Sequence, residues 1–147
     1  MKKLLLATAA TALIAGAASA EDVKMGIILG FTGPLESITP NMATGAELAI
    51  SEVNASGKFA LGTVVPVRAD STCIDAAAAT AAADRLVTAE GIKAIMGADC
   101  SGVTGAILQN VARTNGVAMI SPSATSPALS TAEDDGLFFR TAPSDAR

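Results

Sequence analysis

Three short segments combine hydroxyl side chains with glycine, proline and small residues, a composition that can bind a small polar solute. They are residues 31–37 (FTGPLES), 99–104 (DCSGVT) and 121–127 (SPSATSP), called here the first, second and third loops. The second loop leads into a helical pattern, whose free N–H groups and positive dipole end favour an anion such as a carboxylate. Ser101 is therefore predicted to act both as helix N-cap and as anion donor.

Each loop also has a purely structural interpretation. Ser101 could act as an N-cap alone, and residues 121–127 could form a surface turn. Neither loop would then need a ligand, because Ser, Thr, Gly and Pro are ordinary loop residues. The chemical interpretation therefore depends on whether the fold brings the three loops together.

The elements that would position these loops alternate along the chain. Apolar runs predict strands, and helical spacing ended by Gly57 or Gly91 predicts helices. This alternation predicts an α/β fold: a parallel, flavodoxin-like or Rossmann-like sheet with helices on both faces. Pro66 predicts that its strand lies at an edge. The strands are expected at residues 23–29, 64–69, 93–96, 117–120 and 137–141, and the helices at 42–53, 75–90 and 103–111.

Ligands of such sheets bind outside the carboxyl ends of the strands, where all three loops begin. The strands that end near Gly97 and Ile120 are expected to be neighbours, so that the second and third loops lie side by side. The sequence therefore predicts one shared binding edge.

Composition excludes several kinds of chemistry. The chain has no His and no Tyr or Trp, which removes His-based nucleophilic triads, His-rich zinc sites and axial His ligation of haem. It has neither a Gly-x-Gly-x-x-Gly fingerprint nor a Walker loop, so no nucleotide cofactor is expected. A net charge of −4 gives no electrostatic attraction to nucleic acid or anionic membranes.

Residues 1–20 have the pattern of a cleaved signal peptide. Lys2 and Lys3 precede an apolar stretch, and Ala18-Ser19-Ala20 supplies the small-residue cleavage site. A membrane anchor is the alternative, but the stretch is shorter than the roughly 20 residues that a span needs. No Cys follows the cleavage point, which argues against a lipoprotein. We expect export to the periplasm and no membrane-embedded part.

The two cysteines, Cys73 and Cys100, both follow the predicted signal peptide. An even number of cysteines in an exported protein predicts a disulfide. Metal binding by two cysteines without any histidine is a poor alternative.

Five segments in order resemble the leucine/isoleucine/valine-type periplasmic binding proteins, which are receptors of ABC importers with the type I periplasmic-binding fold. The resemblance covers nearly all of residues 23–143, and the cysteine pair also matches that family's disulfide. Its motifs are residues 26–34, 45–49 (GAELA), 70–73 (DSTC), 97–104 and 120–129.

The resemblance also implies roles for individual residues. In that family the serine after the second cysteine and the Ser/Ala-Ala-Thr loop bind the backbone groups of an amino acid. Carried over, Ser101 holds the α-carboxylate, while Ser123 offers its carbonyl and Thr125 its hydroxyl to the α-ammonium. The family often has an aromatic residue in the first loop near Ile38, so Ile38 is the ligand contact expected there, and the lack of tyrosine suggests a different ligand.

Members of this family have two lobes. We expect residues 21–147 to be the N-terminal lobe, truncated before the second, because a helix is about to begin at residues 144–147. Most of the residues that determine ligand specificity would then be missing, and this chain alone would bind its solute weakly or not at all.

The resulting hypothesis is a non-enzymatic receptor that captures an amino acid or a related small carboxylate or amide and delivers it to an ABC permease. A periplasmic sensor subunit on the same fold is the alternative. An α/β hydrolase is a weaker one, because the chain has no Gly-x-Ser-x-Gly elbow and no His base.

Overall fold

The sheet has five strands in the order β2-β1-β3-β4-β5, and every neighbouring pair is parallel. The structure is a computed structural model that describes residues 21–146; the predicted signal peptide lies outside the described residues. The predicted α/β class is confirmed, and β2 is the edge strand that Pro66 indicated. The strands are β1 (Val23–Leu29), β2 (Val64–Asp70), β3 (Ala94–Gly97), β4 (Ala118–Ser121) and β5 (Phe138–Arg140).

The helices lie where the apolar spacing predicted them. Asp75 caps the second helix by accepting hydrogen bonds from two backbone N–H groups of its first turn, each 2.9 Å long. Gly57, with φ 63°, ends the first helix in the left-handed conformation. The elements are α1 (Thr39–Ser56), α2 (Ala76–Thr88), α3 (Ser101–Ile107), the π-helix η1 (Leu108–Ala112), α4 (Arg113–Asn115) and the 3₁₀-helix η2 (Pro127–Ser130).

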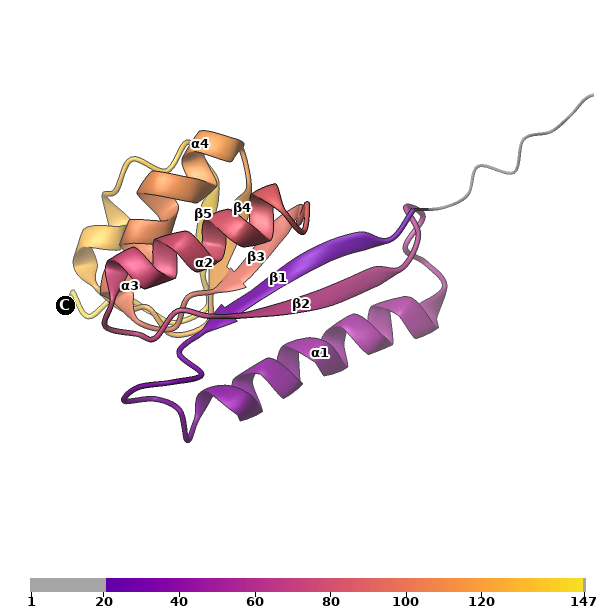
Figure 1. The fold of residues 1–147 in the computed structure, drawn as a ribbon, viewed down its shortest axis with the longest axis horizontal. Coiled ribbons are helices and arrows are strands. Elements are labelled where there is room, and N and C mark those ends of the chain that lie inside the picture. Colours follow the sequence, from indigo (N-terminus) through magenta and orange to yellow (C-terminus); the bar gives the residue numbers. More distant parts are fainter. Residues whose placement is uncertain (1–20, 147) are drawn as a thin grey trace, which may run out of the picture.

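The helices divide between the two faces of the sheet, as Figure 1 shows: α1 lies on one face, and α2, α3 and α4 lie on the other. The larger core packs α2, α3 and η1 against the sheet, with Leu86, Ile95 and Ile107 fully buried. The smaller core packs Ile27 and Leu29 of β1 against α1. This double covering of β1 explains why its sequence is apolar on both faces.

The face under α1 is covered over only part of its width. The register places Ile27, Met96, Ile120 and Phe139 in one row across four strands. Ile27 is fully buried, whereas Ile120 is 38% and Phe139 58% exposed. An apolar cavity of about 300 Å³ lies on this face, lined by Met25, Ala46, Ala49, Ile50, Val53, Val64 and Met96.

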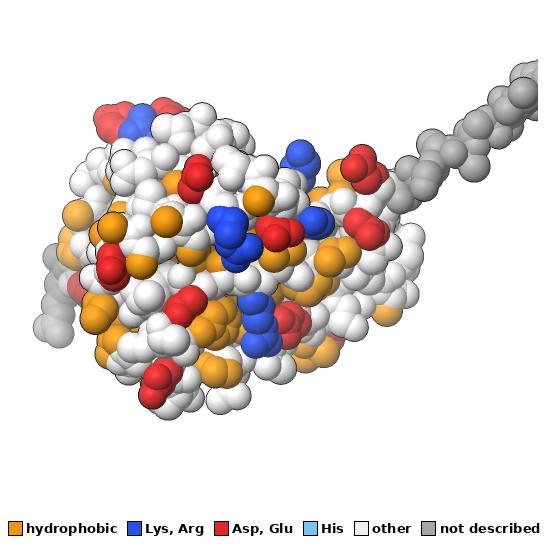
Figure 2. Space-filling view, viewed as in Figure 1, with side chains coloured by type: hydrophobic (Ala, Val, Ile, Leu, Met, Phe, Trp, Pro, Cys, Tyr) orange, Lys and Arg blue, Asp and Glu red, His pale blue; other side chains and the backbone are white. Residues whose placement is uncertain are grey.

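Among the described residues, no helix has both the length and the apolar character that crossing a membrane requires. Figure 2 shows Lys and Arg side chains interspersed with Asp and Glu on the face in view, so no single sign of charge dominates that face.

Candidate functional site

Buried polar side chains of the described chain gather at the carboxyl edge of the sheet. Five polar or charged residues are buried, each at most 3% exposed. All of them lie at the ends of β1 to β4 or in the segments that leave those ends, and each is hydrogen-bonded. Buried hydrogen bonds of this kind fix loop conformation, because leaving any member unpaired is costly. The five are Thr39, Ser71, Asp99, Thr104 and Ser121.

Asp99 joins the ends of three strands. Its Oδ1 accepts hydrogen bonds from the Gly30 N–H, at 3.1 Å, and from the Ser71 hydroxyl, at 3.2 Å. Gly30 follows β1, Ser71 follows β2, and Asp99 itself follows β3. The position of Asp99 in the second loop could be read from the sequence, but its role could not.

The second and third loops lie side by side, as predicted, because β3 and β4 are parallel neighbours. The Ser121 hydroxyl donates to the Ala98 carbonyl at 2.5 Å and accepts from the Ala124 N–H at 2.9 Å. The Ser123 hydroxyl donates to the Asp99 carbonyl at 2.9 Å. These bonds hold the third loop directly against the second.

The cysteines are bonded, as predicted. Cys73 and Cys100 form a disulfide with a Cα–Cα separation of 5.2 Å, which ties the segment after β2 to the second loop. One ligand atom each of Cys73, Asp99 and Cys100 lie within 4.8 Å of one another. Both sulfur atoms are used by the disulfide, so neither is available as a thiolate to bind a metal ion.

Asp70 organises the first loop. Its carboxylate accepts hydrogen bonds from the Thr32 hydroxyl (2.6 Å), the Thr32 N–H (3.3 Å) and the Thr72 N–H (2.8 Å). Partial burial raises the pKa of Asp70, but the hydrogen bonds from Thr32 and Thr72 outweigh it, so the pKa is lowered overall.

We expect Asp70→Asn to lower the free energy of unfolding at pH 7 by about 1 kcal/mol, which is below the range for hydrogen bonds to a charged group because the loop is partly exposed. A lowered folded-state pKa means that the ionised group stabilises the fold above its ordinary pKa of about 3.9. This contribution is lost as the pH falls through the folded-state pKa. Urea unfolding of both proteins at neutral and acidic pH measures the difference; a gap that did not narrow in acid would contradict the assignment.

Ser101 is placed differently from the prediction in one respect. Cys100, not Ser101, occupies the N-cap position of α3, and no side chain caps this helix. The Ser101 hydroxyl oxygen instead accepts hydrogen bonds from the backbone N–H groups of Thr125 and Ser126, both at 3.1 Å. The predicted N-cap role of Ser101 was wrong, because α3 begins at Ser101 and so its N-cap is the residue before it. The N–H groups that Ser101 accepts come from the third loop and not from the first turn of α3.

The backbone carbonyls of the third loop accept hydrogen bonds from Arg140, the last residue of β5, and from the segment that follows it. The carbonyls of Ser121 and Pro122 accept from the Thr141 N–H and hydroxyl, and those of Ala124 and Ser126 accept from the Arg140 guanidinium. The Thr125 carbonyl accepts from the Asp145 N–H at 2.9 Å. Within the described chain, the Ser123 carbonyl is the one from 121 to 126 without a hydrogen-bond donor.

Two hydroxyl groups of the second and third loops also have hydrogen-bonding capacity that no described residue uses. The Thr125 hydroxyl makes no hydrogen bond within residues 21–146. Ser101 uses its oxygen as an acceptor twice, and its O–H donates to no described residue. The structure thus brings together Ser101, Ser123 and Thr125 at one edge, with one acceptor and two hydroxyls available to a ligand.

Ile38 lies just after the first loop, at the N-cap position of α1, and the residue is 52% exposed. It is at the same edge of the sheet, because the first loop leaves the carboxyl end of β1. Its contact with a ligand stays a prediction.

The comparisons with known proteins agree with this architecture. The model of a family described as periplasmic binding protein matches residues 22–147. A Leu/Ile/Val-binding protein of Citrobacter freundii is 34% identical over 144 residues, which is 98% of this chain and 38% of the relative. Leu/Ile/Val-binding protein homolog 7 of Brucella melitensis is 40% identical over 103 residues, which is 69% of this chain and 25% of the relative. The chain therefore spans less than half the length of these relatives.

A solved structure gives the same result. The branched-chain amino acid transporter substrate binding protein of Streptococcus pneumoniae, in complex with isoleucine, is similar with a TM-score of 0.76 and 31% identity, over 85% of this chain and 35% of that one. The family resemblance seen in the sequence is confirmed, and these relatives are binding proteins by name. The chain belongs to the periplasmic binding protein family.

Proposed function

We propose that this chain is the N-terminal lobe of a solute receptor of an ABC importer, and that it binds an amino acid or a related small carboxylate at the carboxyl edge of its sheet. The Ser101 hydroxyl would donate to the α-carboxylate. The Ser123 carbonyl and the Thr125 hydroxyl would accept from the α-ammonium. Ile38 would lie at the rim, beside the ligand's side chain.

One observation carries this proposal: the polar groups that remain free at this edge match an α-amino acid. The Ser101 O–H is a donor suited to a carboxylate, and the Ser123 carbonyl is an acceptor suited to an ammonium group. Their neighbours are already bonded to the protein, so the loops are organised before a ligand arrives. Such preorganisation lowers the cost of binding.

The proposal includes the remainder of a longer receptor. Residues 1–20 would direct export and be removed, and a second lobe would close over the ligand. Closure follows when the ligand binds the closed form more tightly than the open one, and the closed form would then deliver the solute to a permease. The described lobe alone leaves the ligand in contact with water, so its affinity is expected to be weak.

The expected result is that Thr125→Val weakens binding of L-leucine by about tenfold, because a hydrogen bond to a charged group is worth about 1.5 kcal/mol at the lower end. Valine keeps the shape of threonine, and the Thr125 hydroxyl holds no other described residue. NMR titration of the chain with L-leucine measures the dissociation constant even when binding is weak.

A matched ligand separates the two ends of the site. 4-Methylpentanoate has the carboxylate and side chain of leucine without the ammonium group, so Thr125→Val should leave its binding unchanged. Ser101→Ala should weaken both ligands, and it should also loosen the third loop, because Ser101 accepts two of that loop's N–H groups. Equal losses for both ligands in Thr125→Val would show that its hydroxyl does not bind the ammonium group.

A further inference from the structure

Arg140 is the last residue of β5, and the register pairs it with Ser121, where the third loop begins. Its Nη1 donates to the carbonyls of Ser126, at 2.9 Å, and Ala124, at 3.3 Å. Its Nη2 donates to the Ser130 hydroxyl in η2. One guanidinium thus holds the third loop and the turn that follows it.

The two carbonyls that Arg140 occupies lie on either side of Thr125, and the Thr125 and Ser126 N–H groups are held by Ser101. The backbone around Thr125 is therefore fixed from both sides. The hydroxyl of Thr125 and the carbonyl of Ser123 take part in none of these hydrogen bonds.

We propose that Arg140 is a positioning residue of the ligand site, whose guanidinium holds the third loop in the conformation that presents the Ser123 carbonyl and the Thr125 hydroxyl to a ligand. This inference rests on the proposed function. Arg140 does not itself bind the ligand. It occupies the carbonyls of Ala124 and Ser126, and because Thr141 and Asp145 occupy others, the Ser123 carbonyl is the one left for an ammonium group.

The chemistry of the contact requires arginine. A planar guanidinium presents several N–H donors in a fixed fork, whereas a lysine ammonium is a single centre on a flexible stem. Arg140→Lys keeps the positive charge and removes the fork, so it separates geometry from charge. Arg140→Gln removes both.

The first experiment needs no ligand. In Arg140→Lys, we expect the Thr125 and Ser126 amides to exchange with solvent at least tenfold faster, which corresponds to about 1.4 kcal/mol of local opening. The Ile28 amide in β1 should exchange at its original rate, which shows that the fold as a whole is intact. Unchanged exchange at Thr125 and Ser126 would overturn the inference.

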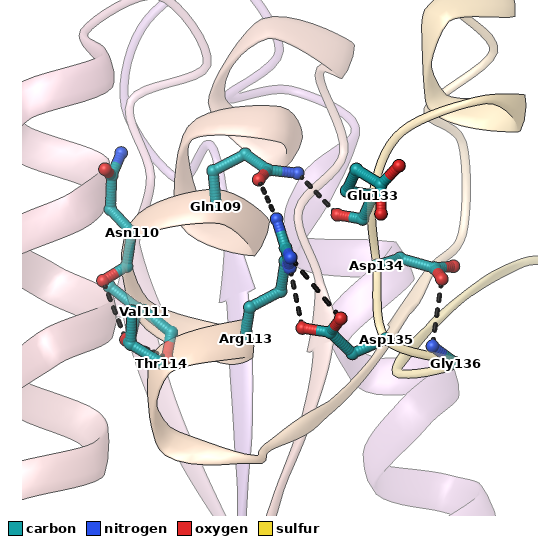
Figure 3. A network of polar contacts seen from close by, with 9 residues as sticks. All are labelled: Gln109, Asn110, Val111, Arg113, Thr114, Glu133, Asp134, Asp135 and Gly136. Carbon is teal, nitrogen blue, oxygen red and sulfur yellow. Dashed lines mark hydrogen bonds and ion pairs between the residues drawn. The ribbon is translucent and has the colours of Figure 1, made fainter.

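A matched control is Arg113→Lys. Arg113 also makes a forked contact, to the Asp135 carboxylate at 2.8 and 3.3 Å, and it donates to the Gln109 side chain at 2.6 Å. Figure 3 shows this network between the η1–α4 helix and the loop before β5. No residue of the network is bonded to the third loop, so Arg113→Lys should leave exchange at Thr125 and Ser126 unchanged.

The second experiment measures binding. Arg140→Lys should weaken L-leucine by about tenfold and 4-methylpentanoate by less than about threefold, because the groups that Arg140 positions bind the ammonium end. Equal weakening of both ligands would mean a merely structural role and would overturn the inference. Leucine binding that left the Ser101, Ser123 and Thr125 signals unchanged would make the proposed function fail, while the exchange rates would still decide whether Arg140 orders the loop.

Discussion

Replacing both Cys73 and Cys100 by alanine should lower the free energy of unfolding by about 3–4 kcal/mol. The bonded residues are 27 apart in sequence, and the value follows from the chain entropy that such a cross-link removes from the unfolded state. Urea unfolding of the oxidised protein and of the double variant measures the difference. A change below about 1 kcal/mol would contradict this account.

The disulfide also holds an unusual backbone segment. Thr72 and Cys73 have φ values of 57° and 71°, a left-handed conformation that non-glycine residues rarely adopt. Without the bridge, this segment should relax and the first and second loops should become more mobile. As a control, a reducing agent should destabilise the unmodified protein and leave the double variant unaffected.

Gly97→Ala should lower the free energy of unfolding by about 3 kcal/mol or more, through backbone strain and overpacking together. Gly97 has φ 136° and lies against Ile28 of β1, its partner in the sheet. A Cβ there would overlap the Ile28 carbonyl oxygen. Both β1 and β3 have a neighbouring strand on each side, so neither backbone can move away without disturbing the sheet. Thermal or urea unfolding measures the loss.

Gly45→Ala is the matched control. Gly45 lies within α1, and a Cβ at that position would meet no atom within 4 Å. The same substitution should therefore stabilise the protein by about 0.5–1 kcal/mol, because alanine favours the helix and restricts the unfolded chain. Similar effects of the two substitutions would show that the close approach at Gly97 is not the cause.

Much of the fold could be predicted from the sequence, because hydrophobic periodicity and breakers are local signals. The apolar run of β1, Pro66 at the sheet edge and Gly57 after α1 each indicated what the structure has. The π-helix Leu108–Ala112 gave no such signal, since its wider turn still keeps Leu108, Val111 and Ala112 buried.

The site was predictable only in part. Ser101, Ser123 and Thr125 were predicted as ligand contacts because the resemblance and the loop composition both pointed to them, and these contacts stay predictions. Asp99 and Arg140 were missed, because their roles depend on partners 69 and 14 to 16 residues away in sequence. The sequence shows an Asp after one strand and an Arg at the end of another. The hydrogen-bond partners of these two side chains are known only once the fold is known.

The measurement that tests the central claim most directly is a chemical-shift map of the labelled chain during titration with L-leucine. The account predicts that the largest changes fall at Ser101, Ser123 and Thr125 and are reduced in Thr125→Val. The apolar cavity beside α1 offers a rival position, lined in part by Ala46 and Ile50. Changes centred on that cavity instead of the carboxyl edge would contradict the account.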